Sequence, residues 1–184
     1  MSQKQIETAV AAILRSVGDD PLREGLAETP KRVAAMYLEL FSGIGVDPVS
    51  AIDTIFDESY EDPVILRDLS FYSFCEHHLL PFYGRANLVY IPSGKIAGIS
   101  KLARCLDVAS RRPQVQERLT SQWADAVVSA LAPVAVGVLI KAEHLCMSMR
   151  GIQKPSTQII TTAIRGDPAA IGMDSRGLME LLRG

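Results

Sequence analysis

The first forty residues repeat apolar positions with the period of a helix. Apolar residues recur at three- and four-residue spacing from Ile6 to Val17, and Gly18 follows as a stop signal. A second helix is predicted to follow Thr29, which we expect to cap it, with Pro30 at its first position. The first ~45 residues are therefore expected to form a helical pair.

The pattern changes after residue 62. Residues 42–62 are rich in Asp, Gly and Pro and are predicted to form a loop, and the chain then alternates as strands do. The expected strands read "PVILRDLSFYSF" (one strand or two), "GRANLVYIP", "IAGIS", "VAVGVLIKAEHLCM" and "STQIITTAI". We expect "SGK" to turn the second of these into the short "IAGIS" as its partner. If extension continues past His144, Cys146 points the same way as His144.

Two helices are predicted among these strands. Ser100 is expected to cap the first, whose apolar stripe includes Leu102 and Cys105, and the second runs from about Val115 to Leu131. A short helix, "SRGLMELLRG", ends the chain. Strands around two helices predict an α+β fold, an antiparallel sheet layered with paired helices. We expect residues 1–62 to form a helical region with its linker, and residues 63–184 to form a second domain that contains the strands of the sheet.

Composition narrows the class of protein. The chain has 184 residues, of which 48% are hydrophobic and 22% charged, as in an ordinary globular protein. No apolar run approaches the ~20 residues of a membrane span, and the N-terminus lacks the features of a signal peptide. With three cysteines and no export signal, we expect reduced thiols, a cytoplasmic location and no membrane partner.

Charge is distributed unevenly along the chain. The net charge of −2 argues against nucleic-acid binding, but residues 1–62 carry 12 acidic and 5 basic residues, whereas residues 63–184 carry 9 acidic and 14 basic ones. An anionic small molecule is a reasonable ligand for the positive part. Basic residues that only keep the surface soluble are the alternative.

Metal-binding residue types cluster in two short segments. All three histidines and two of the three cysteines lie within residues 75–78 and 144–146. Cys75 and His78 have the spacing with which one turn presents two donors to one metal, and Cys146 can supply a third. Thiolate and imidazole donors favour zinc over magnesium or calcium. Cys105 lies on an apolar helical stripe, so we expect it in the core.

The number of ligands decides what such a site does. Three protein ligands leave a position for water, as in catalytic zinc sites, whereas a fourth ligand from His77 or His144 would make the site structural. With three ligands, both of these histidines lie beside the metal, where a neutral imidazole can relay protons near pH 7. Spacing alone leaves the two alternatives open.

Two groups of residues suggest how an anionic substrate is held. Ser100, Lys101 and Arg104 open a helix and are candidates for an anion site, which Arg150 could extend toward the metal. Gln116 and Glu117 open the longer helix, where a carboxylate can accept hydrogen bonds from a guanine edge. A solvated basic face and simple complementation of the helix dipole are the corresponding alternatives.

Five motifs together resemble the GTP cyclohydrolase I family, in the order and spacing of that family. They are "REGLAETPKRV", "FCEHHLLPFYG", "GISKLAR", "RRPQVQERLT" and "EHLCMSMRG". The resemblance implies that residues 63–184 form a catalytic domain with the tunnelling fold, in which antiparallel sheets and paired helices of several subunits form a barrel. It also implies a homodecamer of two pentamers with active sites between subunits. The implied reaction converts GTP and water to 7,8-dihydroneopterin triphosphate and formate, the entry step of tetrahydrofolate and pterin biosynthesis.

The resemblance also implies roles for individual residues. Cys75, His78 and Cys146 match the zinc ligands, and His144, with His77 and Ser100, matches the acid–base groups. The substrate-binding residues implied are Glu117 and Gln116 for guanine, and Lys101, Arg104, Arg150 and Arg32 for the ribose and triphosphate, with Arg32 reaching in from a neighbouring subunit. Two other functions remain possible on the sequence alone: another pterin or purine enzyme of the same fold, and a zinc-stabilised binding module without catalysis.

Overall fold

The computed structural model describes residues 2–183, and Met1 and Gly184, the ends of the two expected domains, lie outside them. The chain divides into two compact units, Met1–Ser42 and Gly43–Gly184. Residues 43–62 belong to the second unit because a short helix there, η1 (Pro48–Ala51), contacts a helix of that unit. That catalysis belongs to residues 63–184 remains a prediction.

The N-terminal unit contains the two predicted helices, α1 (Gln3–Ser16) and α2 (Thr29–Leu40), which contact each other. Ser2 caps α1, since its hydroxyl accepts a hydrogen bond from the Gln5 N–H at 3.4 Å. The predicted cap of α2 was wrong by one residue. Glu28 occupies that position in a helical conformation without a side-chain bond, and Thr29 is already helical.

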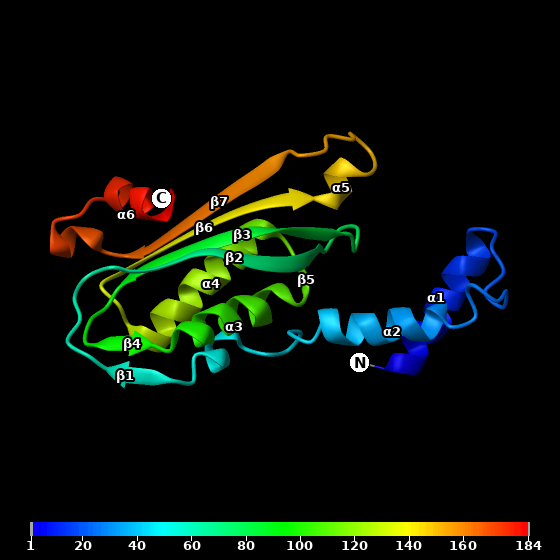
Figure 1. The fold of residues 1–184 in the computed structure, drawn as a ribbon, viewed down its shortest axis with the longest axis horizontal. Helices are drawn as coiled ribbons and strands as arrows, with labels where there is room; N and C mark the ends of the chain where they lie inside the picture. The colour runs from blue at the N-terminus through cyan, green and yellow to red at the C-terminus, as the bar shows by residue number, and fades with distance from the viewer. Residues whose placement is uncertain (1, 184) are drawn as a thin grey trace. The chain divides into compact units, whose positions relative to one another are not determined.

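A five-stranded sheet forms the centre of the second unit (Figure 1). Its spatial order is β5 (Pro113–Gln114), β2 (Val64–Cys75), β3 (Pro81–Ile91), β6 (Ala135–His144) and β7 (Gln158–Gly166). All neighbours are antiparallel except β5 and β2. The segment predicted as one strand or two is a single strand with a bulge between Leu66 and Leu69, where Asp68 has a φ of 57°.

Two predictions about connections were wrong. The short strand after "SGK", β4 (Lys95–Ala97), does not pair with β3 but with β1 (Ile55–Asp57), in a separate two-stranded sheet. The segment predicted as a loop therefore contains a strand as well as η1. Three-residue strands carry too little periodicity to be detected in a sequence rich in turn residues.

Helices cover both faces of the sheet. α3 (Ile99–Ser110) and α4 (Gln116–Leu131) lie on one face, and α6 (Ser175–Arg183), which follows η2 (Pro168–Ile171), lies on the other (Figure 1). The larger core lies under α3 and α4 and includes the fully buried Trp123 and Cys105. The α3 cap is Gly98, so Ser100 lies within the first turn and not at the predicted cap position.

The first six residues of β6, 135–140, are buried on both faces because helices cover both. Val136, Val138 and Ile140 face the larger core, as the alternation predicted, whereas Ala135 and Leu139 pack with α6. The α+β class predicted from the sequence is confirmed. Within residues 2–183 there is no helix with the length and apolar character that crossing a membrane requires.

Candidate metal centre

A tight turn between β2 and β3 places His78 beside Cys75. The Cys75 N–H donates to the Leu80 carbonyl at 2.9 Å, and the Leu79 N–H donates back to the Cys75 carbonyl at 2.8 Å. Leu79 takes a left-handed φ of 52°, which reverses the chain within a few residues. The turn thus presents both donors on one side, as the two-residue gap predicted.

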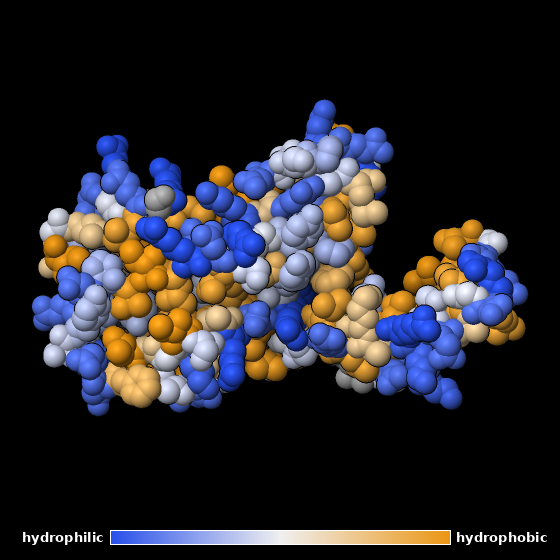
Figure 2. Space-filling view, in the orientation of Figure 1, coloured by the Kyte–Doolittle hydropathy of each residue, from blue (hydrophilic) through white to orange (hydrophobic). Residues whose placement is uncertain are grey.

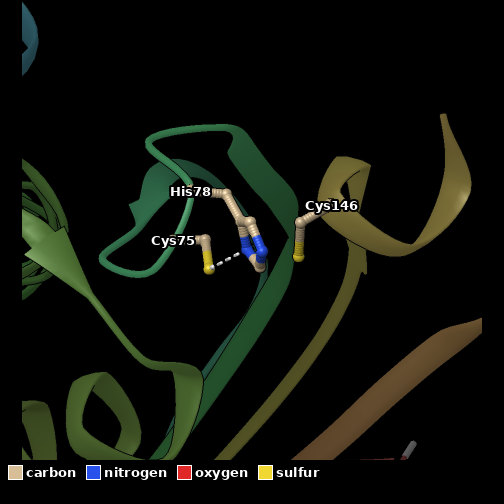
Figure 3. Close-up of side chains that lie close together, drawn as sticks. All are labelled: Cys75, His78 and Cys146. Atoms are coloured by element: carbon tan, nitrogen blue, oxygen red, sulfur yellow. Dashed lines mark hydrogen bonds between the residues drawn. The ribbon is translucent and has the colours of Figure 1, made fainter. Parts of the chain in front are cut away.

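Cys146 comes from the end of a distant strand. β6 ends at His144, and Cys146 lies on the helical turn α5 (Leu145–Ser148), so the continued extension considered above does not occur. Because His144 pairs with Phe82 near the start of β3, the end of β6 lies beside the β2–β3 turn. Figure 3 shows the three side chains pointing toward one another from these two segments.

The donor atoms of Cys75, His78 and Cys146 all lie within 4.8 Å of one another. The Cys75 Sγ is 3.8 Å from the His78 Nδ1. Two ligands of one tetrahedral zinc, at usual bond lengths, are separated by about 3.6 Å from sulfur to nitrogen. The spacing and chemistry of these donors therefore fit a metal ion, and the sequence-based grouping of these three residues is reproduced in space.

Burial raises the pKa of the Cys146 thiol, and the adjacent Cys75 raises it further. Two thiolates so close together repel each other, and a bound divalent cation removes that repulsion. The arrangement is thus better suited to holding a cation than to holding two free thiolates.

His77 and His144 are not among the grouped donors of the described chain. The His77 Nδ1 does lie 3.7 Å from the Cys75 Sγ, but its side chain is 65% exposed and its Nε2 lies 3.8 Å from the Glu76 carboxylate. The His144 Nε2 lies 2.8 Å from the Gln116 Oε1. The grouped donors of the described residues number three, and catalytic zinc sites typically have three protein ligands and an open position.

His144 is held in a defined orientation. Its ring stacks on Phe82, with centroids 4.5 Å apart and an interplanar angle of 4°. Burial lowers its pKa, and the charge of Glu117 opposes that shift. Because the neutral imidazole is favoured here, the position of its single proton matters for chemistry.

Gln116 determines which nitrogen carries that proton. Its side-chain NH2 donates to the carbonyls of Ile140 (3.1 Å) and Ile159 (3.0 Å) and to the Thr161 hydroxyl (3.0 Å). The amide oxygen therefore faces His144, and since an amide oxygen only accepts, the proton is assigned to Nε2. The Nδ1 of His144 is left as the unprotonated nitrogen.

This arrangement changes the interpretation of Gln116. Its side chain is 1% exposed and bonded to protein groups, so it does not present its amide to a ligand. A guanine contact from Gln116 would have to come from its backbone N–H, which lies at the first position of α4, where helices leave such groups free. Glu117 is exposed, and its predicted contact with guanine remains a prediction.

An ion pair not anticipated from the sequence fixes the metal-binding turn. Arg118 on α4 binds both oxygens of Glu76, at 2.6 and 3.2 Å, and the Glu76 N–H donates to the Gln114 carbonyl at 3.0 Å. The hydrogen bond to Arg118 lowers the pKa of Glu76. The sequence contains both partners: Glu76 lies between the proposed ligands Cys75 and His78, and Arg118 lies within "RRPQVQERLT". Nothing in the sequence shows that the two residues meet.

Of the predicted phosphate-binding residues, Arg150 lies at the metal group. Its Nη1 lies 3.4 Å from the His78 Nε2 and donates to the Cys146 carbonyl at 3.3 Å. Arg150 is exposed and can therefore also contact a substrate. Arg32 is an exposed residue of α2 in the N-terminal unit, and its predicted role is addressed below.

Ser100 and Lys101 lie at the far end of α3 from the metal group, and Arg104 lies near the middle of that helix. The C-terminal end of α3 contacts β2 near Cys75, since the Ser73 hydroxyl donates to the Ser110 carbonyl at 2.7 Å. From Ser110 back to Ser100 the helix axis extends about 15 Å. Within this chain Lys101 is paired with Asp53, at 2.6 Å. One chain therefore does not place Ser100 and Lys101 beside the metal group.

Comparison with known proteins gives a family match over almost the whole chain. The family model described as GTP cyclohydrolase I matches residues 6–183. Two curated proteins named GTP cyclohydrolase 1, from Streptococcus pyogenes serotype M18 (strain MGAS8232) and serotype M1, are each 54% identical over 167 residues, which cover 90% of this chain and 86% of the relative. A solved structure, the archaeosine synthase QueF-Like in the apo form, aligns with a TM-score of 0.46 at 19% identity, over 57% of this chain and 94% of that chain.

Substitution of single cysteines should distinguish the metal-binding thiols from the thiol in the core. We expect Cys146→Ser to reduce bound zinc from about one ion per chain to near none, because a serine hydroxyl stays protonated at neutral pH. Cys105→Ala is the matched control, since Cys105 is fully buried and burial raises its pKa to about 12. Elemental analysis of both purified variants is the measurement. Full zinc in Cys146→Ser, or loss of zinc in Cys105→Ala, would show that the wrong thiol was assigned.

Proposed function

Because this chain belongs to the GTP cyclohydrolase I family, we propose that the Cys75, His78 and Cys146 group binds zinc at the catalytic centre of a GTP cyclohydrolase. The α+β architecture is the tunnelling fold of that family. The family reaction converts GTP and water to 7,8-dihydroneopterin triphosphate and formate, in pterin and folate biosynthesis. The observation that carries the zinc proposal is the three-donor group beside the oriented, half-buried His144.

The donor set supports zinc more than other divalent ions. Two thiolates and one imidazole are borderline-soft ligands, and their spacing fits tetrahedral bond lengths. When bound, zinc would lower the pKa of a water molecule and so supply the nucleophile at neutral pH. The alternative of a related enzyme with a different metal site is disfavoured by this donor set and by the family match.

His144 is proposed as the group that moves protons during ring opening. Its Nε2 proton is held by Gln116, so Nδ1 is the atom that can accept a proton and return it to a ring nitrogen of guanine. Its stacking on Phe82 and its bond to Gln116 restrict the rotation of the ring. His77, which is exposed beside Cys75, and Ser100 are proposed as proton partners in the later rearrangement of the ribose.

The substrate is proposed to span two chains. Glu117 accepts hydrogen bonds from the guanine edge, and Arg150 contacts the phosphates beside the metal group. Within one chain, Ser100 and Lys101 lie at the end of α3 farther from the metal group, and Arg104 lies about one turn closer to it. We therefore propose that they come from a second subunit, and that Arg32 of α2 comes from a neighbouring subunit as well.

Surface features support such an assembly. β7 is an outer strand, and the outer side of β2 is paired only at Phe74 and Cys75 among the described residues, so both edges are available for strand pairing. Figure 2 shows hydrophobic surface near β1 and β4, where Phe56 and Ile99 are 53% and 70% exposed. These features are typical of a homo-oligomer, and a decamer of two pentamers is proposed.

Two ligand thiols that must stay reduced support a cytoplasmic location.

Turnover of GTP tests the proposal directly. Zinc-loaded protein incubated with GTP should form a product that fluoresces as a pterin after oxidation. His144→Ala should keep its zinc and lose about 10²- to 10⁴-fold in kcat, the usual range for an acid–base group. A zinc-stabilised binding module without catalysis predicts zinc but no fluorescence in the unaltered protein, and that result would refute the catalytic assignment.

Gln116 and Glu117 should differ in the kinetic parameter that they affect. Because Gln116 acts through His144, Gln116→Leu should lower kcat by about tenfold or more with a smaller change in KM. Glu117→Gln should instead raise the KM for GTP, because a charged acceptor at the guanine edge is lost. Steady-state kinetics, with zinc content as a folding check, separate the two. If Gln116→Leu changed only KM, the result would contradict a role through His144 and would indicate that the Gln116 side chain contacts the substrate.

Mixing of inactive variants tests whether a site takes residues from two chains. Lys101→Ala and His144→Ala should each be inactive, and subunit exchange between them should restore about a quarter of the sites. His144→Ala mixed with Cys146→Ser is the control and should restore nothing, because both residues belong to the same chain's half of the site. Equal recovery in the two mixtures, or none in the first after exchange is verified by mass spectrometry, would contradict the shared site.

A further inference from the structure

A cavity lies on the sheet face opposite α3 and α4. Its volume is ≈ 530 Å³, and it is lined by residues of β2, β3, β6 and β7 and by Arg183 at the end of α6. Figure 1 shows α6 on this face, away from α3 and α4. None of the residues that line this cavity has a role in the reaction proposed above.

Two bases at the floor of this cavity face each other without a carboxylate. Arg85 of β3 and Lys141 of β6 are direct partners in the strand register, a position in which like charges are destabilising. Neither forms an ion pair within residues 2–183, and the Arg85 guanidinium donates only to the Asp68 carbonyl, at 3.0 Å. Arg67 and Arg183 add two more bases to the lining.

The acidic lining residues do not neutralise this pair. Glu143 turns its carboxylate to the Ser148 hydroxyl, at 2.6 Å, and to the Ser156 N–H, at 3.2 Å. Those hydrogen bonds lower the pKa of Glu143. The carboxylate therefore stays charged, but it is engaged by Ser148 and Ser156. Asp68 lines the cavity but forms no ion pair within the described part of the chain. Four bases against two acids leave the cavity positive.

Two tyrosines form one end of the same cavity. Tyr72 and Tyr83 are cross-strand partners whose rings stack with centroids 5.9 Å apart, at an angle of 26°. Tyr72 is 66% exposed and Tyr83 37% exposed, so the outer side of the pair is free to stack on a further planar ring. A row of bases next to exposed aromatic faces is complementary to a phosphate joined to a heteroaromatic ring.

We propose that this cavity is a second binding site, for a small aromatic phosphate of the nucleotide class, separate from the catalytic centre. Its phosphates bind between Arg85 and Lys141, and its ring stacks on Tyr72 and Tyr83. The site lies directly behind the catalytic centre, since Phe82 and His144 point to the opposite face from Tyr83 and Glu143.

Inorganic tripolyphosphate is the probe for the basic pair. Isothermal titration of the zinc-loaded protein should find two sites per chain, of which Arg150→Gln weakens one and Arg85→Gln/Lys141→Gln weakens the other by about tenfold or more. Lys95→Gln/Lys154→Gln is the matched control, because it removes two exposed charges outside the cavity. Zinc content and GTP turnover of the cavity variant should match those of the unaltered protein.

ATP compared with tripolyphosphate tests the tyrosine pair, in the Arg150→Gln background that leaves the cavity as the stronger site. Tyr72→Leu should weaken ATP binding there severalfold and leave tripolyphosphate binding unchanged. In the absence of anions, the Arg85→Gln/Lys141→Gln protein should unfold at the same temperature as the unaltered chain or higher, because a like-charge contact is removed.

The outcomes are distinct from those that test catalysis. One tripolyphosphate site per chain, or two sites that survive in Arg85→Gln/Lys141→Gln, overturns the second site and leaves the cyclohydrolase proposal intact. Loss of both sites in Arg150→Gln alone also overturns it, since the cavity would then bind nothing. Lack of GTP turnover with two sites retained would instead contradict the catalytic proposal and support the cavity.

Discussion

The register between β3 and β6 is the constraint on which the candidate centre depends. It pairs Phe82 with His144, so the end of β6 meets the turn that carries Cys75 and His78. A slip of one residue would move His144 to the opposite face and Cys146 away from its partners. The two strands approach so closely at Gly84 that a Cβ there would lie 1.9 Å from the Lys141 carbonyl oxygen, which only glycine allows. Packing of β6 under helices on both faces fixes the same register.

Buried hydrogen bonds orient the side chains that this register brings together. Gln116 reaches from α4 to the backbone of β6 and β7 and uses its remaining atom to orient His144. Arg118, two residues further along α4, binds Glu76 in the metal-binding turn. The start of α4 thus positions the metal group and its acid–base partner together, while Ser100 and Lys101 lie at the opposite end of α3. In the site proposed above, which takes residues from two chains, catalysis would depend on assembly.

Much of this arrangement can be predicted from the sequence. The remaining features could not be predicted, because they depend on contacts that form only in the folded chain. The long helices and strands have strong periodicity, and the Cys75, His78 and Cys146 group follows from donor type and spacing. The pairing of β4 with β1 could not be predicted, because three-residue strands gain their stability from the tertiary structure. The hydrogen bonds of the Gln116 side chain could not be predicted, because they depend on two backbone carbonyls that only the folded chain brings to it. The opposition of Arg85 and Lys141 likewise exists only through the register.

The central claim is that three side chains hold one zinc ion and leave a coordination position free for water. A crystal structure of the zinc-loaded protein, with anomalous data collected at the zinc edge, tests it most directly. The account predicts one ion per chain bound by the Cys75 and Cys146 sulfurs and a His78 nitrogen, with a water molecule as the fourth ligand. A nitrogen of His77 or His144 in that fourth position, or no ion among these residues, would contradict it.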